Sequence, residues 1–113
     1  MYLMAVNSPM DIFQVLSDPH RRRLISLLKQ DGSMSLKALS EGTDISRQAV
    51  TKHLNKLIQV KLVYAEFQGR VKVHTLNDQA LLPVYQWLSP FARQWQHRLD
   101  NLDEFLNQEN PNE

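Results

Sequence analysis

The segment from Ser46 to Lys56 carries basic, amide and hydroxyl side chains at spacings that place them on one side of a helix. The apolar residues Val50, Leu54 and Leu57 of this helix are predicted to face inward. The helical repeat then turns a polar set outward, made up of Arg47, Gln48, Thr51, Lys52 and Asn55. Arginine pairs through two hydrogen bonds with guanine, and glutamine or asparagine pairs likewise with adenine. These side chains are therefore predicted to contact base edges in a DNA major groove; the alternative is an ordinary solvated helix face.

Four more polar residues lie beside this set or follow it in the chain. Ser46 precedes the helix, where its hydroxyl can cap the first turn and can also bind a phosphate. Lys56 lies further along and suits a phosphate contact. Arg70 and Lys72 belong to a predicted hairpin, where basic side chains fit the negative potential of a minor groove. The alternative for these two is a charged strand edge that prevents aggregation.

Patterns typical of enzymes and metal sites are missing from the sequence. The histidines are scattered over different predicted elements, and no glycine-rich phosphate loop or nucleophile motif accompanies them. For His53, at the border of the apolar stripe, we expect a packed side chain rather than a base contact. The chain has no cysteine, which excludes disulfides and thiolate metal sites. We therefore expect neither an enzyme nor a bound cofactor or metal.

The charges are unevenly distributed, although the formal net charge at pH 7 is only +1. Through Leu76, eleven lysines and arginines oppose six acidic residues, a net of +5. From Asn77 onward two basic residues oppose six acidic ones, a net of −4. No acidic residue lies between Ile45 and Ala65. A basic body favours a polyanionic partner, and double-stranded DNA is the partner we expect.

Three consecutive arginines, Arg21, Arg22 and Arg23, stand near the start of a predicted helix. Neighbouring residues of a helix point in different directions, so the run cannot act as one cluster. We expect at least one of the three to pair with an acidic neighbour and only one to contact a phosphate.

Residues that favour helix termini divide the first half of the chain into helices. Three of them precede apolar repeats and are predicted N-caps: Asp18, Ser35 and Ser46. Pro19 suits a first helical position, and Gly32 and Gly42 suit helix ends. A shorter apolar face at residues 12–16 precedes these helices.

The second half combines a hairpin with a long helix. Residues 62–67 and 71–76 are rich in β-branched and aromatic residues and flank Gln68-Gly69-Arg70, which predicts a β-hairpin. After Asn77 apolar residues recur every 3.5 residues, and Pro90 is expected to bend or restart that helix. The order predicts a mostly α fold with a β-hairpin wing, a winged helix-turn-helix with a long C-terminal helix.

We expect a single domain over residues 1–113, with the helix-turn-helix core and wing at 9–76 and a dimerisation helix at 77–107. The apolar repeat of that helix is too extensive for the surface of a monomer. Its predicted dimer contacts are Tyr85, Leu88, Trp95, Leu99 and Leu102.

Two segments resemble the ArsR family of bacterial winged-helix repressors. Residues 16–25, Leu-Ser-Asp-Pro-His-Arg-Arg-Arg-Leu-Ile, are similar to the opening helix of the family. Residues 45–54, Ile-Ser-Arg-Gln-Ala-Val-Thr-Lys-His-Leu, are similar to its recognition helix. The resemblance covers residues 13–106 and implies a homodimer that binds a pseudo-palindromic operator and represses nearby genes.

The chain departs from the metal-sensing members of that family. Ser35 and Lys37 stand at the positions that resemble their cysteine pair, and neither side chain replaces a thiolate. His97, Asp100 and Glu104 on the last helix are too few ligands for the zinc site of other members. A histidine-based metal-responsive repressor therefore stays an alternative, as does a winged helix that binds protein instead of DNA.

No segment has the features of a signal peptide, and no apolar run reaches the ~18 residues of a membrane span. We expect a cytoplasmic protein that makes no membrane contact. A repressor of this kind would also need an effector, either a small molecule or a protein, which the sequence does not identify.

Overall fold

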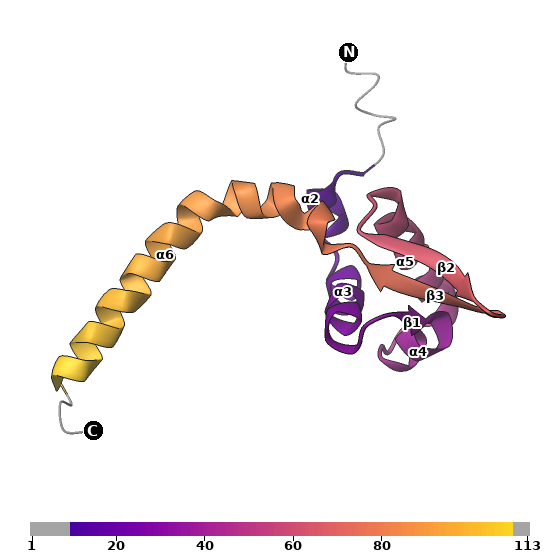
Figure 1. Ribbon diagram of the computed structural model, residues 1–113, viewed down its shortest axis with the longest axis horizontal. Helices are drawn as coiled ribbons and strands as arrows, with labels where there is room; N and C mark the ends of the chain where they lie inside the picture. Colours follow the sequence, from indigo (N-terminus) through magenta and orange to yellow (C-terminus); the bar gives the residue numbers. More distant parts are fainter. Residues whose placement is uncertain (1–9, 110–113) are drawn as a thin grey trace, which may run out of the picture. The chain divides into compact units, whose positions relative to one another are not determined.

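The computed structural model describes residues 10–109. The chain divides into two parts, one that ends at Leu82 and one that begins at Pro83. The first part contains, in order, α2 (Ile12–Val15), α3 (Pro19–Asp31), β1 (Met34–Ser35), α4 (Leu36–Glu41), α5 (Arg47–Gln59), β2 (Val63–Gln68), β3 (Val71–Leu76) and the short 3-10 helix η1 (Asp78–Leu81) (Figure 1). A single long helix, α6 (Leu82–Glu109), continues into the second part.

All three predicted N-caps are confirmed. The side chain of Asp18 accepts from the backbone N–H groups of His20 and Arg21, at 2.7 and 3.3 Å. The hydroxyls of Ser35 and Ser46 each accept from the backbone N–H three residues later, both at 3.1 Å. These bonds satisfy N–H groups that have no partner inside the helix, so the starts of α3, α4 and α5 are set by local sequence.

The strands form one antiparallel sheet in the order β1-β3-β2. The predicted hairpin is confirmed, with Gln68 opposite Val71 and only Gly69 and Arg70 in the turn. Gly69 has φ of +66°, a value that glycine adopts without steric cost and that such two-residue turns require. The sequence did not predict β1, whose two residues pair with His74 and Val73 and make the wing three-stranded.

The core of this first part lies between the helices and one face of the sheet. α5 packs on α3, α4 and β2, and β3 packs on α3. The fully buried side chains come from every layer: Val15, Leu24, Leu39, Val50, Leu57, Leu62 and Val63. This arrangement is a mostly helical winged helix-turn-helix, as predicted.

The end of α5 is closed by a Schellman motif that contains a lysine. The N–H of Leu62 donates to the carbonyl of Leu57 at 3.0 Å, and the N–H of Lys61 donates to that of Ile58 at 2.9 Å. Lys61 lies at the position that glycine usually occupies and has φ of +63°. A side chain in this left-handed conformation costs about 1 kcal/mol or more, which the buried pair of Leu57 and Leu62 offsets.

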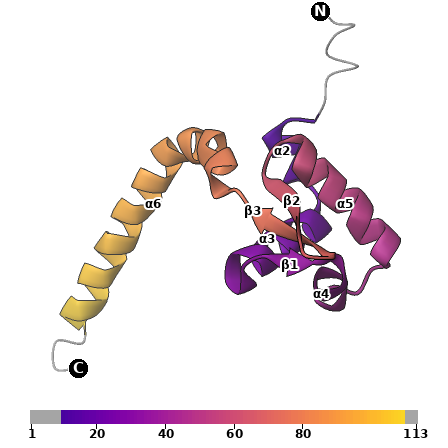
Figure 2. The same cartoon turned by 45° about the vertical axis from the view of Figure 1, so that its right-hand side comes forward.

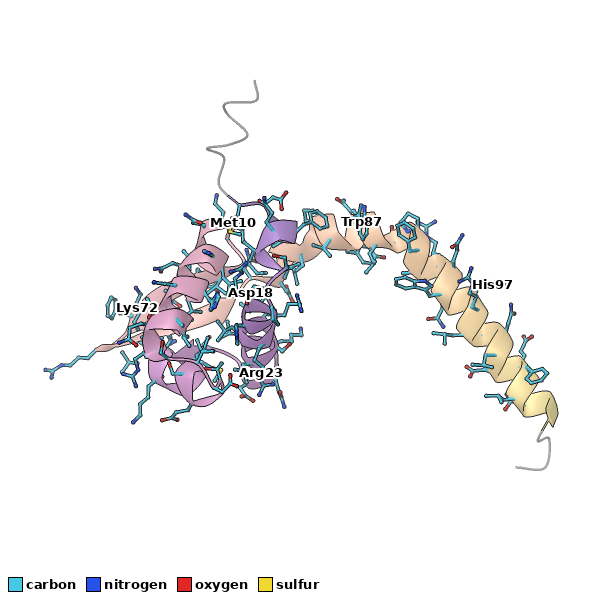
Figure 3. All side chains as sticks on the ribbon, turned by 180° about the vertical axis from the view of Figure 1, so that it is seen from behind. Met10, Asp18, Arg23, Lys72, Trp87 and His97 are labelled. Carbon is cyan, nitrogen blue, oxygen red and sulfur yellow. The ribbon has the colours of Figure 1, made fainter. Side chains whose placement is uncertain are left out.

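The long helix α6 bends but does not restart at its proline. The bend lies between Trp87 and His97 (Figure 3). Pro90 has no N–H for the carbonyl of Gln86, four residues earlier, and this missing bond explains the bend. The hydroxyl of Ser89 donates to the Gln86 carbonyl at 3.2 Å instead, so the oxygen keeps a partner. No helix within residues 10–109 is both long and apolar enough to cross a membrane.

The Lys61→Gly substitution should stabilise the protein. Glycine adopts a positive φ freely, and the relief of strain exceeds the added chain entropy of the unfolded state by about 0.5 kcal/mol. Chemical denaturation measures the change. Lys61→Ala keeps a Cβ atom and serves as the control, which should leave stability close to that of the wild type. A loss of stability in the glycine variant would show that the lysine side chain stabilises the fold.

Candidate nucleic-acid interface

The turn between α4 and α5, the two helices of the helix-turn-helix, lies close to α3. Gly42 ends α4, and a Cβ atom at this position would lie 2.8 Å from the Cδ1 atom of Leu27, a buried residue of α3. Glycine therefore permits the close approach of the turn to α3. After the turn, Ser46 caps α5, and this hydrogen bond occupies its hydroxyl oxygen as the sequence predicted. A phosphate contact of Ser46 stays a prediction.

α5 is buried along one side and exposed along the other. Val50, Leu54 and Leu57 are at most 2% exposed, as predicted. Six exposed residues form the outer face of α5: Arg47, Gln48, Thr51, Lys52, Asn55 and Lys56. In Figure 2 the helix runs along one edge of the first part of the chain. These six side chains are thus available to a ligand as large as a DNA duplex.

Thr51 has less freedom than its neighbours on the outer face. Its hydroxyl donates to the carbonyl of Arg47 at 3.0 Å, so the proton is used inside the helix. The oxygen lone pairs and the methyl group remain. A threonine methyl contacts the methyl group of thymine, which is the base contact that this geometry favours.

The wing brings Lys72 beside α5. Lys72 is exposed and lies on the same face of the sheet as His74, two residues later. Both line a crevice of about 160 Å³ together with Thr51 and Asn55 of the outer face. Figure 3 labels Lys72 on the hairpin. Arg70 lies in the exposed turn between β2 and β3. The structure therefore brings Thr51, Asn55 and Lys72 together, and places Arg70 at the tip of the wing.

His74 anchors this part of the wing to β1. It is 5% exposed, and its Nδ1 atom donates to the carbonyl of Met34 at 3.2 Å. Burial lowers the pKa of His74, the Met34 carbonyl opposes this effect, and the charge of Lys72 adds to it. The ring is therefore neutral at pH 7, and the positive charge at the crevice comes from Lys72.

The basic side chains of this surface are free of acidic partners. Among the side chains of residues 10–107, the one ion pair joins Lys29 to Asp78 at 3.6 Å, and neither residue lies on α5 or in the wing hairpin. The cations without such a pair include Arg47, Lys52, Lys56, Arg70 and Lys72. Their charge is available to neutralise phosphates, and α5 and the wing form one basic surface.

Among the described residues, the three consecutive arginines, Arg21, Arg22 and Arg23, do not have the acidic partner that the sequence predicted. None of the three forms an ion pair within that part of the chain, so the prediction is wrong. Each donates to backbone carbonyls instead: Arg21 to Val15 and Gln14, Arg22 to Leu16, and Arg23 to Gly42. No feature of the sequence indicated that Arg21 is buried.

Metal ligands do not gather in the described part of the chain. No group of three or more histidine, aspartate or glutamate side chains lies close enough to hold an ion. On α6, Asp100 accepts a hydrogen bond from the Gln96 amide at 3.0 Å, which occupies one of the atoms that a zinc ion would need.

A capped helix with a polar, basic outer face, joined by a tight turn to a preceding helix and flanked by a basic wing, defines a winged helix-turn-helix DNA-binding protein. Comparison with known proteins agrees. Residues 16–63 match the family model for a helix-turn-helix domain. The transcriptional repressor SdpR of Bacillus subtilis is 31% identical over 81 residues, which are 72% of this chain and 89% of SdpR.

Solved structures show the same fold. An ArsR-like transcriptional regulator from Rhodococcus sp. RHA1 is 28% identical, with a TM-score of 0.63 over 83% of this chain and 88% of its own. A homodimeric winged helix-turn-helix DNA-binding domain from Mycobacterium bovis has a TM-score of 0.60 at 16% identity, over 86% of this chain and 87% of its own. The chain belongs to the ArsR family of DNA-binding transcriptional regulators. The family consists of regulators and not enzymes, which confirms the exclusion of catalysis.

Substitutions on α5 and the wing should separate sequence preference from general affinity. Arg47 lies in the first turn of α5, the part of a recognition helix that enters the groove deepest. Arg47→Ala should cost ~1 to 3 kcal/mol per half-site and relax the preference for particular base pairs. Lys56→Ala and Arg70→Ala should weaken binding to all sequences and lower the salt dependence by about one unit per lost contact.

The measurement is a titration of a DNA site selected from a random library, and of its scrambled sequence, at several salt concentrations. Each alanine variant is compared with the wild type on both sequences. An unchanged ratio of the two affinities in Arg47→Ala, with a collapsed ratio in Arg70→Ala, would contradict these assignments.

Proposed function

We propose that this regulator is a homodimeric repressor whose two α5 helices enter successive major grooves of a pseudo-palindromic operator. The base contacts are assigned to Arg47, Gln48, Thr51, Lys52 and Asn55. The contacts to phosphates and to the minor groove are assigned to Ser46, Lys56, Arg70 and Lys72. Half-sites would lie about 34 Å apart, or a multiple of that distance. Repression follows because a duplex covered by the dimer excludes the polymerase.

The proposal of a dimer is supported by the exposed apolar surface of α6. Tyr85, Trp95, Leu99 and Leu102 are 67, 49, 55 and 50% exposed, and Leu88, in the same repeat, is partly buried. Large apolar side chains at a spacing of three and four residues along one helix need a partner surface, because their exposure to water costs ~1.5 to 3 kcal/mol each. A second copy of the same helix supplies a surface of matching pattern and length.

Two observations favour repression of genes through DNA over the other functions considered. The outer face of α5 is polar and basic, whereas a protein-binding winged helix would present apolar groups there. SdpR, a relative whose name describes a transcriptional repressor, aligns over nearly its whole length. We propose that the protein acts in the cytoplasm and that an effector, a small molecule or a protein, releases it from DNA by changing the spacing of the two α5 helices.

The Leu99→Glu substitution tests the dimer. A glutamate would place an unpaired charge in the contact between the two helices, so the variant should be monomeric and should bind the selected DNA site poorly. Asn101→Glu is the matched control, since it adds the same charge two residues away, on the opposite side of α6. It should stay dimeric. Sedimentation at micromolar concentration distinguishes the two states, and a monomeric wild type would refute the proposal.

A further inference from the structure

The guanidinium group of Arg21 is buried at a junction of three helices. The residue is 4% exposed although it carries a charge. Its Nε atom donates to the carbonyl of Val15 at 2.6 Å, and Nη2 donates to that of Gln14 at 3.3 Å. Nη1 lies 3.3 Å from Nδ1 of His53. Arg21 itself belongs to α3, Gln14 and Val15 to α2, and His53 to α5. One side chain thus joins α2 and α3 to the recognition helix.

The contact between Arg21 and His53 determines which ring nitrogen of the imidazole carries the proton. A guanidinium group has donors only, so Nδ1 of His53 must accept the hydrogen bond and carries no proton. The proton of the neutral ring is then on Nε2. Burial lowers the pKa of His53, while the carboxylate of Asp18 opposes this effect. Electrostatic interactions with Arg21, His20 and Lys56 lower the pKa of His53 further.

The surroundings of His53 come from α3 and from its own helix. The His20 ring lies 5.7 Å from the His53 ring, centroid to centroid, at 32°. Burial acts to raise the pKa of Asp18, but hydrogen bonds from the backbone N–H groups of His20 and Arg21, together with electrostatic interactions with His53 and Arg21, lower it below its usual value. Asp18 is therefore ionised at neutral pH. The cap of α3, the Arg21 side chain and the His53 ring form one hydrogen-bonded and electrostatic cluster.

The position of His53 on α5 gives this cluster a role beyond stability. His53 lies beside the buried stripe of Val50, Leu54 and Leu57, on the border with the outer face. Apolar packing has no preferred direction and tolerates a small rotation of a helix. A hydrogen bond is directional and weakens steeply as its angle closes. The bond to His53 therefore adds a directional restraint on rotation of α5 about its axis.

We propose that Arg21 is a positioning residue of the DNA interface, which fixes the rotation of α5 through His53 and so aims Arg47 and Gln48 at the base edges. This inference rests on the proposed function. Carbonyls of α2 hold the buried guanidinium in place. Its hydrogen bond to the imidazole of His53 then restrains the orientation of the recognition helix.

The Arg21→Lys and Arg22→Lys variants test the proposal as a matched pair. Both keep the positive charge, and both lose a guanidinium bond to a backbone carbonyl, but only Arg21 contacts α5. Arg21→Lys should weaken binding to the selected DNA site about tenfold and change binding to scrambled DNA less than about twofold. Arg22→Lys should stay within about twofold on both. Equal losses in the two variants would overturn the proposal.

Two substitutions of His53 test the same contact from the other side and leave the Arg21 side chain itself unchanged. His53→Gln keeps an acceptor and should bind like the wild type, whereas His53→Leu should lose about tenfold on the selected site only. In a double-mutant cycle, Arg21→Lys combined with His53→Leu should be no weaker than either single variant. Additive losses would overturn the proposal.

The pH profile gives a readout that a purely structural role would not change. Protonation of His53 makes Nδ1 a donor, which removes the acceptor of Arg21. The folded state holds the pKa of His53 below the usual 6.5. The bond between Arg21 and His53 is therefore intact above pH 6.5 and is lost as the pH falls through the lowered pKa of His53. Affinity for the selected site should fall in that range in the wild type and less in His53→Gln, which keeps the other three histidines.

A profile that is identical in the wild type and His53→Gln would overturn the proposal. Failure of the proposed function is distinguishable, because the wild type itself would then select no DNA sequence from a random library. If the wild type selects a site and both Arg21→Lys and His53→Leu bind it normally, only the positioning role is wrong.

Discussion

The recognition helix α5 can pack on the rest of the protein only through the face opposite the one assigned to DNA. The other elements of the first part of the chain are arranged around this constraint. Val50, Leu54 and Leu57 are buried on α3, α4 and β2, and each such side chain contributes ~1.5 to 3 kcal/mol. That burial fixes where the helix lies. Its starting point is set by the Ser46 cap and its end by the Schellman motif, and Gly42 lets the turn before it lie close to α3.

Local signals explain what could be predicted from the sequence. The capping residues, the one-sided apolar stripe of α5 and the glycine in the hairpin turn each act within a few residues, so their types and spacing define the element. The same stripe predicted that the outer face of α5 would be exposed. The strong repeat of α6 indicated one long helix, and its proline indicated the bend.

Features that depend on distant partners could not be predicted in this way. The two residues of β1 are too few for a pattern, and they form a strand only because β3 lies beside them. Arginine is mostly exposed in proteins, so nothing in the run of three distinguishes Arg21 as the buried one. Its carbonyl and imidazole partners come from α2 and α5, which adjoin it only in the folded chain. A positive φ at Lys61 was likewise hidden by a residue type that rarely adopts it.

The outer face of α5 has a consequence for how such regulators diverge after gene duplication. Within the described part of the chain, Thr51 is the only one of the six whose side chain hydrogen-bonds to the protein, and all six are exposed, so most substitutions there change stability by no more than about 0.5 kcal/mol. Substitutions on the outer face can therefore change the DNA sequence that the protein prefers while the fold remains intact. In the supporting cluster, Arg21 is buried, Asp18 and His53 are partly buried, and the three residues are interdependent, so substitutions among them are expected to be coupled. The residues of α5 that face outward can therefore vary independently of the cluster that supports the helix from α3.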